Sequence, residues 1–145
     1  MKIEQYSDKY YTDVIEVITN FYNEAVSDYD KGGINLEQLK HQVIKYSPNS
    51  FLLIVNDKCE GLLAGAEVNS GLNDKKIYQE IVWYVNEAHR RYGIFMLHKA
   101  MAMLKEQGFT KLVMACLHNS KTEKLIKLYE QMGFKPIETH FLKEL

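Results

Sequence analysis

The chain has 145 residues, of which 46% are hydrophobic and 26% charged, as expected for one globular domain with its own core. With a formal net charge of −1, the chain has no overall positive potential that would attract nucleic acid. No apolar run is long enough to span a membrane. The chain begins without the apolar segment of a signal peptide, and its two cysteines, Cys59 and Cys116, have no CxxC spacing. We therefore expect a single cytoplasmic domain over residues 1–145, with no disulfide scaffold and no structural zinc.

The first 50 residues predict a strand followed by two helices. Residues 1–6 are a short strand candidate, and Ser7 is placed to cap a helix whose apolar residues lie on one side. Asn35, with Gln38 three residues later, resembles a capping box, so a second helix should begin there. Pro48 should end that helix, because proline lacks the amide that a helix interior needs.

The middle of the chain predicts three strands and a long helix. Residues 51–56 and 59–69 flank a polar turn and should pair as a hairpin. Residues 77–85 are rich in β-branched and aromatic side chains, which indicates a strand that is buried on both faces. Residues 95–107 have apolar side chains at helical spacing, and Gly108 supplies a C-terminal stop.

The last part predicts a strand, a helix and a closing strand or pair of strands. Residues 111–115 form a short buried strand. Ser120 and Glu123 have the spacing of a capping box, and Gly133 should end the helix that follows. Residues 137–145 should close the chain as one or two strands. The element order is therefore β-α-α-β-β-β-α-β-α-β, which is an α/β sheet packed with helices.

The stretch HRRYGIFMLHKA, residues 89–100, places basic residues and a glycine between a predicted strand and a predicted helix. Amides at a helix start, together with the helix dipole, favour an anion such as a pyrophosphate. Arg90 and Arg91 add bidentate donors, while Gly93 permits close approach of a ligand or a positive φ. The alternative is a plain exposed turn. One short basic run on a chain of this charge does not indicate a nucleic-acid site.

Two motifs together resemble the GNAT superfamily of N-acetyltransferases. That family's loop, [Q/R]-x-x-G-x-[G/A], is matched at Arg90 and Gly93, between a strand and a helix as the family requires. The family then expects a short strand and a helix that ends in LYEKxGF, and residues 128–134 are LYEQMGF. The specific match covers roughly residues 77–136. The resemblance implies a GNAT-like mixed central sheet flanked by helices.

The chain departs from the family pattern in three places. Phe95 stands where the loop normally ends in a small residue, and Thr122 stands where many members have an asparagine, although Asn119 is close by. The tail after Gly133 and Phe134 is short. The Phe95 ring must turn into the core or intrude on the phosphate path, and we expect it in the core because its neighbours are apolar.

The resemblance implies acetyl-CoA as co-substrate. The amides expected to bind its pyrophosphate are those of Arg90, Arg91, Tyr92, Gly93, Ile94, Phe95 and Met96. Its pantetheine arm would hydrogen-bond like an added strand beside Trp83, Tyr84 and Val85. Asn119 and Thr122 would make further cofactor contacts. An acceptor amine would then attack the thioester directly.

Two side chains are candidates for the proton transfers that this reaction needs. Tyr129, in the LYEQMGF motif, matches the tyrosine that the family often uses as the acid for the leaving thiolate; the alternative is a core tyrosine. Glu80 lies among apolar residues of a predicted strand that often carries the family's base. It could equally be a solvated or ion-paired residue, and Glu67 is the reserve candidate.

The acceptor site is expected near the segment that joins the first two helices. Tyr22 and Tyr29 flank the acidic stretch NEAVSDYD there and are the candidate acceptor-binding residues. Glu24, Asp28 and Asp30 could attract a cationic amine, but a solvated loop explains them equally well.

We therefore interpret the chain as an acetyl-CoA-dependent N-acetyltransferase acting on a primary amine of a small molecule or peptide. The alternative is a non-catalytic binding module with the GNAT fold, in which the loop no longer admits CoA. The histidines lack metal-ligand spacing, so no metal is expected. We expect no nucleic-acid or membrane partner, and a homodimer is possible.

Overall fold

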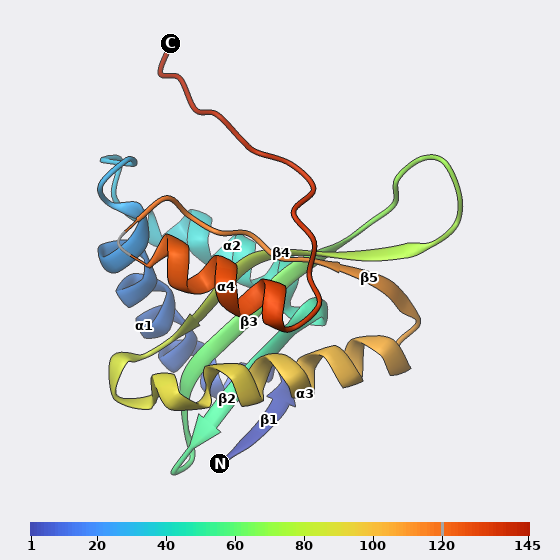
Figure 1. The fold of residues 1–145 in the computed structure, drawn as a ribbon. Coiled ribbons are helices and arrows are strands. Elements are labelled where there is room, and N and C mark those ends of the chain that lie inside the picture. The colour runs from blue at the N-terminus through green and yellow to red at the C-terminus, as the bar shows by residue number, and fades with distance from the viewer. Residues whose placement is uncertain (120) are drawn as a thin grey trace. The chain divides into compact units, whose positions relative to one another are not determined.

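The computed structural model describes residues 1–119 and 121–145 (Figure 1). Two compact units can be distinguished, Met1–Ala115 and Cys116–Leu145. The expectation of a single domain over residues 1–145 stays a prediction.

The first unit is built on a mixed five-stranded sheet whose strands lie side by side in chain order. The strands are β1 (Lys2–Gln5), β2 (Ser50–Val55), β3 (Lys58–Val68), β4 (Lys76–Val85) and β5 (Phe109–Val113). Neighbours from β1 to β4 pair antiparallel, whereas β4 and β5 pair parallel. The sheet confirms the predicted fold class, and each strand begins within two residues of its predicted start.

The hairpin of β2 and β3 closes through two residues in the left-handed region, Asn56 at φ 50° and Asp57 at φ 61°. Positive φ at both central positions is the geometry of a tight type I′ turn, which matches the twist of the flanking strands. Further along β3, a Cβ on Gly65 would lie 2.4 Å from the buried Tyr78 ring of β4. A glycine is required there because the ring lies directly over the neighbouring backbone.

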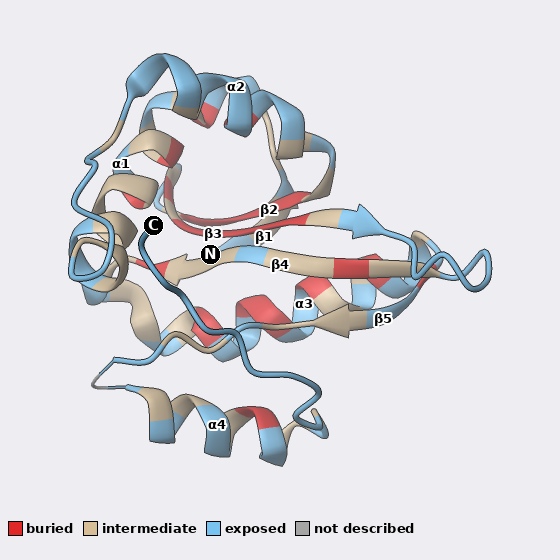
Figure 2. Cartoon of the chain, turned by 90° about the horizontal axis from the view of Figure 1, so that it is seen from above, coloured by how far each residue is buried: buried red, intermediate tan, exposed pale blue. Residues whose placement is uncertain are grey.

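Helices cover both faces of this sheet (Figure 2). Helices α1 (Tyr11–Phe21) and α2 (Leu36–Tyr46) lie over one face, and α3 (Gly93–Glu106) lies over the other. The start of α2 is as predicted, because the Asn35 side chain accepts a hydrogen bond from the amide of Gln38 at 3.0 Å. The expectation for Ser7 is wrong in detail. A short 3-10 helix, Asp8–Tyr10, precedes α1, and Ser7 makes no side-chain capping bond.

The second unit contains α4 (Thr122–Gln131), which ends before Gly133 at φ +89° as predicted. Ser120 of the expected capping box lies outside the described residues. The predicted strands at 137–145 are not formed, since residues 134–145 carry neither helix nor strand. Phe141 is 93% exposed, and Ile137 and Leu142 are exposed as well. A strand needs a neighbouring backbone and a buried face, and this segment has no buried side chain.

Candidate active site

The C-terminal half of β4 forms an open edge. The last described pair between β4 and β5 is Gln79 with Val113, whereas β4 continues to Val85. Register with β3 also shifts here: Ala64 opposes Val82, but Gly65 opposes Glu80, so Ile81 is one extra residue in β4. Such a bulge kinks a strand, although pairing of β4 with β3 continues to Val85. The prediction of a strand buried on both faces is therefore wrong for this half, where Ile81 is 43% exposed.

The backbone of this open edge can be oriented from one hydrogen bond. The Asn86 amide donates to the Glu60 carbonyl of β3 at 2.9 Å. Along an antiparallel strand, every second residue directs its N–H and C=O groups to the same neighbouring strand, so the Tyr84 backbone also points toward β3. The Trp83 and Val85 backbone groups then point to the open side. Of the three residues expected beside pantetheine, Trp83 and Val85 thus point their backbone groups to the open side, where the Trp83 backbone is hydrogen-bonded to the Glu80 carboxylate.

Glu80 lies at this open edge. Its carboxylate accepts a hydrogen bond from the Ala115 amide at 2.8 Å and another from the Trp83 backbone. Burial raises the pKa of the Glu80 carboxyl from 4.5 to about 7, although these two hydrogen bonds oppose the rise. A carboxyl with a pKa near neutrality is suited to accept a proton from an amine at physiological pH.

The reserve candidate, Glu67, has a different environment. Its side chain is 52% exposed and forms an ion pair with Lys76 at 3.4 Å. A solvated, ion-paired carboxylate has little reason to act as a base. The geometry therefore favours Glu80 among the two candidates on these strands.

The segment before α3 is a 3-10 helix, Glu87–Tyr92, and not an open loop. Gly93 begins α3 at φ −58°, which excludes the positive φ considered from the sequence. It is buried, and a Cβ there would meet Trp83 and Val85 only at 3.8 and 3.9 Å, which is ordinary contact. Neither backbone conformation nor packing within this unit requires a glycine at this position.

The two arginines before the helix are already engaged. Arg90 is bound by the Glu24 carboxylate, which also accepts a hydrogen bond from the Tyr84 hydroxyl at 2.7 Å. Glu24 belongs to a π-helical turn, Tyr22–Val26, that follows α1. Arg91 donates to the Tyr92 hydroxyl at 3.1 Å. Because only Nη2 of Arg90 is bound to Glu24, a phosphate could share this side chain with Glu24 or compete for it, and the sequence did not predict this contact.

The expectation for Phe95 is wrong. Its ring is 37% exposed and lies beneath the Lys99 ammonium, 5.7 Å from the ring centroid. Met96 and Leu97, by contrast, are fully buried. Lys99 lies one turn further along α3, so Phe95 belongs to the polar face of the helix.

The two tyrosines expected at the acceptor site differ in their surroundings. The Tyr22 hydroxyl donates to the Asp30 carbonyl at 2.6 Å and accepts from the Gly33 amide at 3.0 Å. It therefore holds the loop that precedes α2. Tyr29 is 46% exposed, and burial of its hydroxyl end, with Asp30 nearby, raises its pKa. Tyr29 is the more accessible of the two.

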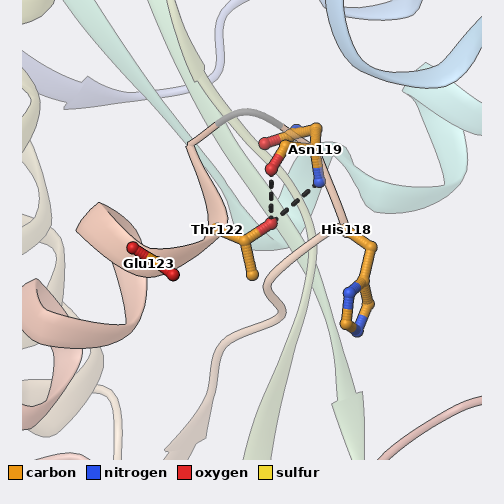
Figure 3. A pocket seen from close by; sticks show the side chains of 4 residues that line it. All are labelled: His118, Asn119, Thr122 and Glu123. Carbon is orange, nitrogen blue, oxygen red and sulfur yellow. Dashed lines mark hydrogen bonds between the residues drawn. The ribbon is translucent and has the colours of Figure 1, made fainter.

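Three predicted residues belong to the second unit. Tyr129 is buried in α4, with its ring 5.3 Å from that of Phe134. Asn119 and Thr122 line an open pocket with His118 and Glu123 (Figure 3). The Thr122 hydroxyl accepts from the Asn119 amide at 2.8 Å and donates to the Asn119 carbonyl at 2.7 Å. Thr122 thus shapes the turn before α4.

The two free cysteines differ in burial. Burial raises the pKa of the Cys59 thiol to about 12, so the thiolate is scarcely formed near neutral pH. Cys116 is partly exposed, and its sulfur contacts the Thr122 carbonyl at 3.7 Å. Among the described residues, no three His, Cys, Asp or Glu side chains could jointly hold a metal ion. None of the helices described is long and apolar enough to cross a membrane.

Comparison with known proteins agrees with the motifs. The model of the acetyltransferase (GNAT) family matches residues 12–134. No curated protein sequence matches the chain.

Solved structures share the fold at low sequence identity. An aminoglycoside acetyltransferase, HMB0005, from an uncultured soil metagenomic sample has a TM-score of 0.75 at 17% identity, covering 99% of this chain and 97% of its own. A ribosomal-protein-alanine N-acetyltransferase from Brucella melitensis biovar Abortus 2308 has a TM-score of 0.75 at 14% identity, with coverages of 99% and 98%. AAC(6')-Iy, in complex with the bisubstrate analogue CoA-S-monomethyl-acetylneamine, has a TM-score of 0.71 at 10% identity, with coverages of 99% and 97%.

Proposed function

Because the chain belongs to the acetyltransferase (GNAT) family, we propose that it transfers an acetyl group from acetyl-CoA to a primary amine. The observation that carries this proposal is Glu80, a carboxyl with a pKa near 7 at the open edge of β4. Family membership supports acyl transfer in general, and Glu80 supports an acceptor that must lose a proton.

The residues at the end of β4 and the start of α3 fit the proposed co-substrate. Val85 presents its backbone to the open side of the sheet, where an amide-containing arm can add as a strand would. Gly93 begins α3, where amides and the helix dipole favour a pyrophosphate. We assign further contacts to the amides of residues 90–96 and to Asn119 and Thr122.

The proposed chemistry is a direct displacement. The acceptor nitrogen forms a bond to the thioester carbonyl carbon, the carbon–sulfur bond breaks, and CoA leaves as a thiolate. Glu80 takes the proton that the amine gives up, directly or through one water. Tyr129 is the proposed donor of a proton to the leaving thiolate, a role that rests on its place in LYEQMGF.

The test combines a binding and a turnover measurement. Acetyl-CoA should raise the melting temperature, because it binds the folded protein. A panel of primary amines should then release free CoA thiol. The pH profile of kcat/KM should fall on its acid side with an apparent pKa near 7, since Glu80 must be ionised to act. An unmoved melting curve at saturating acetyl-CoA would contradict the co-substrate assignment and favour the non-catalytic binding module.

A further inference from the structure

An apolar cavity of about 170 Å³ lies in the first unit between helices α1 and α2 and the sheet. Val14 of α1 and Val43 of α2 belong to its lining, as do Ala64 of β3 and Val82 of β4. Small side chains therefore face one another across the space between the helices and the sheet. Protein interiors leave few voids larger than a water molecule, so a cavity of this volume exceeds an ordinary packing defect.

Helix α2, which forms one wall of the cavity, is lightly packed. Of its 11 residues, Val43 is the one that is buried. Leu39 and Gln42 also belong to the lining, and Leu39 is partly buried whereas Gln42 is exposed. A helix with so little buried surface can open locally at low cost in free energy. A small molecule can therefore enter the cavity without unfolding of the whole unit.

The cavity and the proposed base lie on opposite faces of the sheet. Residues paired across two antiparallel strands share a face, and consecutive residues of one strand point to opposite faces. Ala64 and Val82 are paired, and both line the cavity. Gly65 follows Ala64 and pairs with Glu80, so the Glu80 side chain belongs to the other face. A ligand in this cavity is therefore separate from the proposed proton transfer.

The lining favours an uncharged apolar ligand. No charged side chain of the described residues lines the cavity. The Ser50 hydroxyl donates to the Tyr46 carbonyl at 2.8 Å, and the Tyr6 hydroxyl is hydrogen-bonded to Asp8. Gln42 is exposed and Tyr46 is partly exposed, so the polar ends of both side chains can stay in water. An ammonium or a polyol placed inside would lose water without enough new partners, which is costly.

The volume of the cavity sets the size of its ligand. An apolar protein cavity of roughly 150 Å³ stays dry and binds benzene. A cavity of about 170 Å³ can thus hold one benzene-sized group. We propose that this cavity is a ligand-binding site, separate from Glu80, for one uncharged molecule with an aromatic or branched aliphatic group of about benzene size. The inference goes beyond the proposed acetyl transfer and does not rest on it.

The experiment uses fluorobenzene as the probe. Its binding to the full chain is followed by fluorine NMR, and the effect of benzene on the melting temperature is measured by calorimetry. Glycerol, a small molecule that bears hydroxyl groups, is the polar competitor. Ala64→Leu fills the cavity from the sheet, and Leu39→Phe fills it from α2 should the first variant fold poorly. Ala66→Leu is the matched control, because Ala66 lies on the same strand but does not line the cavity.

The expected result is saturable binding of fluorobenzene to the wild type at one site. Benzene should raise the melting temperature, because it binds the folded protein, and glycerol should not displace fluorobenzene. Ala64→Leu should weaken fluorobenzene binding by at least about tenfold, since the added side chain takes the space of the ligand. Ala66→Leu should bind fluorobenzene as the wild type does.

Two results would overturn the inference. One is the absence of saturable fluorobenzene binding to the wild type, or equal binding to the Ala64→Leu and Ala66→Leu variants. The other is displacement of fluorobenzene by glycerol, which would contradict the apolar character of the site. None of these measurements requires turnover, so failure of acetyl transfer to any amine would leave this result unchanged.

Discussion

Replacing Glu80 by glutamine should make the protein more stable than the wild type at alkaline pH. In the unfolded chain the carboxyl has its ordinary pKa of 4.5, whereas burial raises it to about 7 in the folded protein. Between these values the folded state binds more protons, so the stability that this group contributes is complete below pH 4.5 and is lost as the pH rises through 7. At about 1.4 kcal/mol for each pKa unit, the loss in the wild type is on the order of 3 kcal/mol.

Glutamine has no charge to desolvate, so the variant should lack this loss. Urea unfolding of both proteins at pH 5 and pH 8.5 gives the difference in free energy of unfolding at each pH. From pH 5 to pH 8.5, the free energy of unfolding of Glu80→Gln should rise by roughly 3 kcal/mol relative to that of the wild type. Glu67→Gln is the control, because its exposed ion pair is worth less than about 1 kcal/mol at either pH. A difference for Glu80→Gln that stays constant with pH would refute the assigned environment of the carboxyl.

Three further predictions concern the co-substrate and the acid. Tyr129→Phe should lower turnover by roughly 10²–10⁴-fold with acetyl-CoA affinity nearly unchanged, and full activity would remove Tyr129 from the mechanism. Glu24→Gln should release Arg90 and tighten acetyl-CoA binding by about two- to fivefold in calorimetry, since a half-exposed ion pair is worth up to about 1 kcal/mol; weaker binding would mean that the pair positions Arg90. Phe95→Ala should cost no more than about 1 kcal/mol in urea unfolding, and a cost of about 3 kcal/mol or more would mean a buried ring.

Local chemistry made most of the fold predictable. The polar turn after β2, the Asn35 cap and the glycines that end α3 and α4 each act within a few residues, and all lie where the sequence predicted them. Phe95 shows a signal that was present and missed. Residues three and four positions after it, His98 and Lys99, are polar, so helical periodicity already placed Phe95 off the buried face.

Other features depend on contacts that sequence patterns do not encode. Arg90 and Glu24 are 66 residues apart, and no periodicity relates them. A bulge adds one residue to a strand without changing its composition. The sequence therefore could not predict the extra Ile81 in β4 or the open edge beyond it. The raised pKa of Glu80 comes from burial of its carboxyl in the folded chain, which no local sequence pattern reports. Residues 137–145 have strand-like composition but lack a buried face, which only the folded chain reveals.

The non-catalytic binding module required that Phe95 block the cofactor loop. The ring is 37% exposed beneath Lys99 and not in the core, so acetyl-CoA binding decides between the two interpretations. Groups with strongly shifted pKa values cluster at functional sites, so the buried carboxyl of Glu80, with its pKa near 7, is the candidate base of the proposed reaction.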